Sequence, residues 1–156
     1  MEWKDLDSRR CSVARTAAVV GDGWTVLVLR DLFNGVRRFD DLATHLAIAR
    51  NVLTRRLAAL VEEGVVERVP YREPGSRERH EYRLTAAGRD LRPVILAMMA
   101  WGDTHRAGPD GPPLRVEHPA CGAPVHVELR CAEGHVIEPD TRLRSIPSPA
   151  AAATSP

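Results

Sequence analysis

The hydrophobic pattern of the chain changes period twice, and the order of those periods is what most limits its fold. From residue 13 to residue 63, apolar side chains recur at the three- and four-residue spacing of helices. Residues 65–69 and 80–84 alternate instead, as two paired strands do, and the helical spacing returns after residue 85. The predicted order is therefore four helices, a β-hairpin and one further helix.

Local signals mark the ends of these segments. Helices are predicted over residues 13–20, 24–33, 39–46, 50–63 and 85–105. Gly35 and Gly64 each follow a helix at the position of a left-handed cap. Trp24 falls on the apolar stripe of the second helix, so we expect it in the core. Pro93 lies inside the last predicted helix and is expected to kink it.

The helices over 39–46 and 50–63 are joined by a short turn at residues 47–50 and followed by a charged hairpin. This order is a helix-turn-helix with a wing. The fold class we predict is mainly α with a β-hairpin wing (α+β), a winged helix-turn-helix. On the helix over 50–63, Leu53, Leu57 and Leu60 share the buried stripe with Val61, and Arg55 points away from it.

The chain changes character after Gly108, where nine of its twelve prolines lie. We expect short strands and turns there, which form a small β-rich C-terminal extension over residues 107–144. Residues 145–156 carry few large apolar side chains and are predicted to be disordered. The rest of the chain is predicted to consist of an N-terminal arm at residues 1–10 and a winged-helix domain for DNA binding and dimerisation at residues 11–106.

Five short motifs, spread in order over residues 11–102, resemble the HxlR-type transcriptional regulators. They are Cys11-Ser-Val-Ala-Arg-Thr, Gly23-Trp-Thr-Val-Leu-Val-Leu-Arg-Asp-Leu32, Arg37-Arg-Phe-Asp-Asp-Leu42, Val52-Leu-Thr-Arg-Arg-Leu57 and Tyr82-Arg-Leu-Thr-Ala-Ala-Gly88. The resemblance implies a small bacterial DNA-binding regulator, usually a homodimer on a pseudo-palindromic operator. It also implies that the first and last helices build the dimer.

The helix after the turn offers side chains that suit base reading. Arginine pairs with guanine and asparagine with adenine in the major groove, and helix-turn-helix proteins present such groups at the helix N-terminus. The predicted base-contacting set is Arg50, Asn51, Thr54 and Arg55. A merely solvated helix face is the alternative, which the hairpin and the resemblance disfavour.

Further arginines suit the DNA backbone or a minor groove. Arg72, Arg77 and Arg79 lie in the charged segment between the strands, where glutamates partly offset them. Arg37 and Arg38 precede the third helix, and a solvated turn explains them equally well. Residues 36–92 carry twelve basic and nine acidic side chains, so we expect weak non-specific binding and a specificity that depends on dimerisation.

Cys11 is a candidate redox sensor, because several members of the resembling family sense quinones, aldehydes or oxidants at this motif position. Nearby arginines and a helix N-terminus favour the reactive thiolate. The alternative is a small residue packed at the dimer interface.

The extension contains a possible ligand set for structural zinc. It consists of His118, Cys121, Cys131 and His135, two close pairs nine residues apart. Thiolate and imidazole can complete a tetrahedron around zinc, although this spacing is not that of paired Cys-x2-Cys motifs. Idle, reduced cysteines in a β-extension are the alternative, and no cofactor is required by the rest of the pattern.

Other classes of protein fit the sequence poorly. The longest apolar run, Val94 to Trp101, is far below the ~20 residues that cross a bilayer, and no leader is visible, so we expect a cytoplasmic protein. Neither a phosphate-binding glycine loop nor a catalytic arrangement is present, so we expect no enzyme. The prediction is a homodimeric repressor that binds double-stranded DNA and responds to a small-molecule or redox signal. A protein-interaction module that uses the winged helix without DNA is the alternative.

Overall fold

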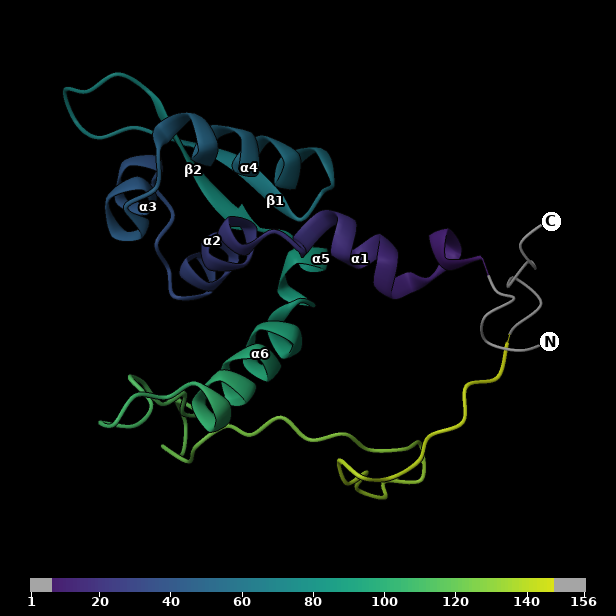
Figure 1. Ribbon diagram of the computed structural model, residues 1–156. Helices are drawn as coiled ribbons and strands as arrows, with labels where there is room; N and C mark the ends of the chain where they lie inside the picture. The colour runs from purple at the N-terminus through teal and green to yellow at the C-terminus, as the bar shows by residue number, and fades with distance from the viewer. Residues whose placement is uncertain (1–6, 148–156) are drawn as a thin grey trace. The chain divides into compact units, whose positions relative to one another are not determined.

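The computed structural model describes residues 7–147, and its contacts group them into two units (Figure 1). One unit contains the described residues up to Asp90 together with residues 145–147, and the other contains residues 91–144. This division falls after Asp90, whereas the sequence analysis places the domain boundary at residue 106. The predicted domain boundaries therefore stay predictions. Residues 1–6 of the predicted arm and 148–156 of the predicted tail lie outside the described residues.

The first unit contains the helices and the hairpin that the periodicity predicts. Its elements are the 3-10 turn η2 (Ser8–Arg10), α1 (Ser12–Val20), α2 (Gly23–Phe33), α3 (Phe39–Leu46), α4 (Arg50–Glu62), β1 (Val66–Tyr71), β2 (Arg79–Leu84) and α5 (Ala86–Arg89). The ends of the predicted helices α1–α4 and of both strands are confirmed to within two residues. The mainly α fold with a β-hairpin wing is therefore confirmed.

The core of this unit lies between α2, α3, α4 and the start of β1. Its fully buried apolar side chains include Val28, Leu29, Leu42, Leu53, Leu57 and Leu60. Burial of each such side chain contributes about 1.5–3 kcal/mol. The leucines of α4 repeat every three or four residues, so one stripe faces the core and the opposite face is left to solvent.

Trp24 is not a core residue, and that prediction is wrong. Its side chain is 38% exposed, whereas the buried face of α2 is formed by Thr25, Val28, Leu29 and Leu32. Apolar residues occur on more than one face of α2, so their spacing alone does not define which face is inside.

A buried carboxylate joins α2 to α3. Asp31 is 1% exposed, and its Oδ1 accepts hydrogen bonds from Arg30 Nε and Nη2 at 2.9 and 2.7 Å. Its Oδ2 lies 2.6 Å from Nδ1 of His45 near the end of α3. Both oxygens of this buried carboxyl group therefore have partners, and the contact with His45 links α2 to α3.

The wing is a two-stranded antiparallel sheet in which Val66 pairs with Leu84 and Tyr71 with Arg79. The segment before α3 adds a short third edge, since Arg38 forms a bridge with Glu81 and the Tyr82 amide donates to the Arg37 carbonyl at 2.8 Å. Arg37 and Arg38 are thereby held beside the wing.

The prediction of one continuous last helix over residues 85–105 is wrong. The structure has a short α5, capped by the Thr85 hydroxyl, and a separate α6 (Arg92–His105) in the second unit. Pro93 occupies the first turn of α6, where no amide donor is needed. Inside a continuous helix its ring would clash with the carbonyl four residues earlier, so the chain breaks before it rather than kinking at it.

After α6, the described chain has turns and isolated bridges but no strand. The bridges join Gly108 to Gly111, Glu117 to Pro124 and Arg130 to Val136. The predicted β-rich character of the extension is therefore not confirmed within residues 107–147. Across the described part of the chain, no single helix is long and apolar enough to span a membrane, and α1 with α2 reaches that length only across a 79° bend.

Candidate nucleic-acid interface

The N-terminal end of α4 projects from the domain as a polar, exposed helix end. The turn before it runs from Ala47 to Ala49, and Ala47 adopts a left-handed conformation (φ 49°) that ends α3. No side chain caps α4 at Ala49. The free amides of an uncapped helix N-terminus can donate to an anion such as a phosphate.

All four residues of the predicted base-contacting set are exposed at this end, and three of them bind within the protein. Arg50 Nη1 donates to Asp40 Oδ1 at 2.8 Å, and its guanidinium lies 4.7 Å from the centre of the Phe39 ring. The Asn51 side chain accepts from the next backbone amide at 2.9 Å, and the Thr54 hydroxyl donates to the Arg50 carbonyl at 2.8 Å. These contacts hold the side chains in place before any ligand arrives.

Arg55 and Arg56 are adjacent in sequence but have different roles in the structure. Arg56 Nη2 donates to Asp22 Oδ2 at 2.8 Å, and Asp22 also caps the N-terminus of α2. Arg56 therefore attaches α4 to α2. The side chain of Arg55 is exposed and has no hydrogen bond or ion pair to any residue within 7–147.

Three predicted arginines from separate segments meet in one recess. Arg38, Arg50 and Arg79 line a cavity of about 350 Å³ between the start of α3, the start of α4 and the wing. Arg68 of β1 lines it too, and sequence reasoning missed this residue because nothing local distinguishes it from other strand arginines. Asp40 and Asp41 also line the recess, so its positive charge is partly neutralised.

The tip of the wing, residues 72–78, carries Arg72 and Arg77, which are both exposed. Neither has a partner among residues 7–147. Arg38 is engaged at the base of the tip, where its Nη1 lies 2.8 Å from Glu73 Oε1 and its guanidinium lies 4.7 Å from the centre of the Tyr71 ring. The tip therefore offers two unpaired guanidinium groups to an anionic partner.

Cys11 lies at the N-cap position of α1 and is half-buried. Of its arginine neighbours, Arg9 is engaged elsewhere, since its side chain and backbone amide donate to the Asp7 carboxylate. The Arg9 side-chain hydrogen bond, more than any other contact, holds the pKa of Asp7 below its usual value. Arg9 is therefore committed to Asp7, and within the described part of the chain no hydrogen bond joins its guanidinium to Cys11.

The four predicted zinc ligands lie in two separate turns. His118 Nδ1 lies 3.4 Å from Cys121 Sγ, and His135 Nδ1 lies 3.5 Å from Cys131 Sγ. Within residues 7–147 the structure brings together no group of three or more side chains that could hold a metal ion. Each turn brings together one histidine and one cysteine, which is two of the four ligands that zinc needs. The zinc site stays a prediction.

Comparisons with known proteins agree with this geometry. The uncharacterized HTH-type transcriptional regulator Rv3095 of Mycobacterium tuberculosis is 46% identical over 138 residues, 88% of this chain and 85% of that protein. The crystal structure of PA1607, a candidate transcription factor, superposes with a TM-score of 0.75 at 38% identity and covers 88% of this chain and 99% of that one. The redox regulator HypR in its oxidized form has a TM-score of 0.56 at 31% identity over 63% of this chain and all of that one.

The family comparison covers the whole helix-turn-helix and wing. Residues 19–108 match the HxlR-like helix-turn-helix family, whose members are DNA-binding transcription regulators and not enzymes. This confirms the resemblance that the sequence motifs carry. The chain belongs to the HxlR-like helix-turn-helix family of transcriptional regulators.

Proposed function

We propose that this regulator binds a pseudo-palindromic operator as a homodimer and represses the promoter in which that operator lies. The observation that carries the proposal is the exposed end of α4, which presents Arg50, Asn51, Thr54 and Arg55 beside a recess lined by further arginines. A helix end of this kind fits the major groove, and the wing arginines fit the adjacent backbone. A dimer seated on a promoter blocks polymerase without any further surface.

The second unit supplies a surface suited to a second copy of the chain. On α6, Val94, Met98 and Trp101 are 42, 51 and 56% exposed, and they line one apolar groove with Leu129 of the extension. No residue of α6 is fully buried in the single chain. An apolar stripe of this kind is typical of a helix that packs against a partner, and two-fold symmetry would match the two halves of an operator.

The test is fluorescence anisotropy of a labelled fragment from the gene's own upstream region, titrated with pure protein at two salt concentrations. Binding that resists competitor DNA and weakens with salt supports the proposal. If neither this fragment nor a random-site selection yields a preferred sequence, the operator-binding proposal is wrong.

Loss of the Asp40 charge is expected to strengthen DNA binding. The carboxylate holds Arg50 at 2.8 Å and is exposed, so Asp40→Asn frees the guanidinium and removes a negative charge beside the DNA. Exposed ion pairs contribute about 0–1 kcal/mol, so we expect up to about fivefold tighter binding for each subunit of the dimer. Asp110→Asn, an exposed carboxylate of the extension, is the control. Weaker binding by Asp40→Asn in the anisotropy titration would show that Asp40 positions Arg50 for DNA instead of restraining it.

A charge placed on the apolar stripe of α6 is expected to separate the dimer. Trp101→Glu puts a carboxylate where the partner would bury an aromatic ring, and such central residues contribute about 2 kcal/mol or more. Sedimentation velocity should show a monomer at micromolar concentration. Leu143→Glu is the control, because Leu143 is 64% exposed and does not line the groove. If Trp101→Glu sediments as wild type does, α6 is not the dimer interface.

We further propose that Cys11 makes operator binding sensitive to oxidants. HypR, a redox regulator of known structure in oxidized and reduced forms, shares the fold at 31 and 32% identity. In this chain Cys11 is half-buried at the start of α1, so an oxidant can reach its sulfur.

Diamide takes one hydrogen from each of two thiols and leaves a disulfide, and the thiols proposed here are Cys11 of the two copies in the dimer. Diamide is expected to lower operator affinity of the wild type reversibly and to leave Cys11→Ser unaffected. The other two thiols are exposed, so a double variant, Cys121→Ser with Cys131→Ser, is the matched control and should respond as the wild type does. The readout is the same anisotropy titration before oxidation, after diamide and after reduction. A diamide response that persists in Cys11→Ser assigns the sensitivity to the extension instead.

A further inference from the structure

Helix α6 presents two opposite faces, and only one of them carries the apolar stripe. At 3.6 residues per turn, the positions of Val94, Met98 and Trp101 lie on one side of the helix. The other side carries Leu96, Met99, Ala100 and Asp103. The extension lines both faces, but Val94, Met98 and Trp101 do not line the cavity on the second face, so a ligand bound there would not contact these three residues of the proposed dimer stripe.

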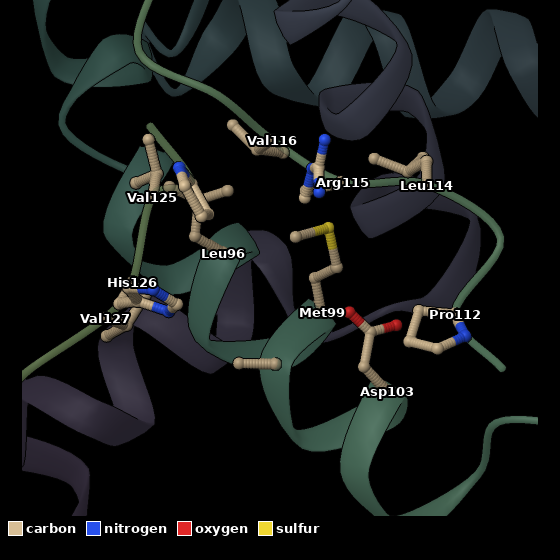
Figure 2. Close-up of a pocket in the computed structure, with 12 residues that line it drawn as sticks. Leu96, Met99, Asp103, Pro112, Leu114, Arg115, Val116, Val125, His126 and Val127 are labelled. Carbon is tan, nitrogen blue, oxygen red and sulfur yellow. The ribbon is translucent and has the colours of Figure 1, made fainter. Parts of the chain in front are cut away.

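A cavity of about 640 Å³ lies between this second face and the extension. Figure 2 shows the side chains of Met99 and Asp103 pointing from α6 toward the segment that carries Leu114 and Val116. A further wall is formed by residues 124–127. The volume is within the ~300–1,000 Å³ range of small-molecule sites, and most of the lining side chains are apolar, as in such sites.

The charges at this cavity favour a cation. Asp103 is half-buried, and its carboxylate has no hydrogen bond or ion pair to any residue within 7–147. Among the described residues that line the cavity, Arg115 is the one arginine or lysine, and Glu117 pairs with it at 2.6 Å. The lining therefore leaves one uncompensated negative charge beside apolar walls. A carboxylate in that position is stabilised by an opposite charge.

We propose that this cavity binds a lipophilic cation, with the apolar body against Leu96, Met99 and Val116 and the positive charge beside Asp103. Such a molecule would contact the apolar walls and would place a positive charge beside the carboxylate of Asp103. Its role as an effector of the regulator rests on the proposed function, whereas binding itself requires no DNA.

The probe is tetraphenylphosphonium, titrated calorimetrically into the full chain without DNA, beside tetraphenylborate, an anion of nearly the same size and shape. We expect saturable binding of about one phosphonium per chain and at least about tenfold weaker binding of the borate. Asp103→Asn should weaken phosphonium binding about tenfold, as loss of a partly buried charge pair does. Asp110→Asn, which removes an exposed charge outside the cavity, should leave it unchanged.

A second variant tests the location without a change of charge. Ala100 lines the cavity, so Ala100→Trp should fill it and abolish phosphonium binding while operator binding persists. The proposal is overturned if the phosphonium does not saturate, if the borate binds as tightly, or if the two asparagine variants behave alike. It is also overturned if the phosphonium converts the dimer to monomer in sedimentation, because a second copy would then occupy the cavity. Since no DNA is present in the calorimetry, failure here leaves the operator proposal standing.

Discussion

Replacing Arg55 with alanine is expected to weaken operator binding at least about 30-fold while leaving the fold intact. The Arg55 side chain is exposed near the start of α4 and has no hydrogen-bond or ion-pair partner among residues 7–147, so its removal breaks no such bond within the described protein. A bidentate contact from arginine to guanine is worth about 1–3 kcal/mol. A dimer makes that contact twice, which doubles the loss to at least about 2 kcal/mol.

The neighbouring residue shows why Arg55 is the sharper test. Arg56 is the arginine that holds Asp22 at the start of α2, so its removal would loosen the packing of α4 before any DNA is bound. Arg55→Ala should therefore unfold at the same denaturant concentration as the wild type, whereas Arg56→Ala should unfold earlier. Comparison of the two separates recognition from stability.

Two control variants separate base reading from simple charge. Arg55→Lys keeps the charge but not the planar fork, so the slope of affinity against salt should persist while preference for the operator over random DNA falls. Arg142→Ala removes an exposed charge from the extension and should bind as the wild type does. If Arg55→Ala binds the operator within about twofold of the wild type, α4 does not read DNA through this residue.

The order of helices and strands was predictable from the sequence because each boundary has a local cause. Gly35 and Gly64 adopt positive φ angles of 84° and 67° at the ends of α2 and α4, as helix-ending glycines do. The leucines of α4 repeat at helical spacing and are buried. Signals of this kind lie within a few residues of the helix or strand end that they determine, so the boundaries could be predicted without knowing the tertiary contacts.

The contacts that hold the DNA-binding residues were not predictable, because they join positions far apart in the chain. Asp40 with Arg50, and Asp22 with Arg56, are ordinary charged residues until the fold brings them together. Asp31 is similar, since an acid in an apolar helix reads as a surface residue until its contact with His45 is seen. The cavity beside α6 was also not predictable, since it depends on how a segment with no strand returns to the helix.

Gly88→Ala is expected to be the most damaging single-methyl change in the first unit. A Cβ at this position would overlap the Val65 carbonyl oxygen and would lie 3.1 Å from a methyl carbon of Leu84. That carbonyl is not free to move, because it accepts from the Thr85 amide at 3.1 Å, and the Thr85 hydroxyl in turn accepts from the Gly88 amide at 3.1 Å. The structure thus explains why a glycine ends the motif Tyr82–Gly88.

Relief of this clash requires α5 to move away from β1, which breaks the hydrogen bonds of Thr85. Overpacking of a close contact costs about 1–3 kcal/mol or more, and we expect about 3 kcal/mol here, with a fall in Tm of about 10 °C. Chemical unfolding followed by circular dichroism measures it. Gly23→Ala adds the same methyl where nothing lies within 4 Å, and it should change stability by less than about 0.5 kcal/mol. Equal stability of the two variants would mean that α5 does not pack on Val65, and the wing would then lack the support that holds it beside α4.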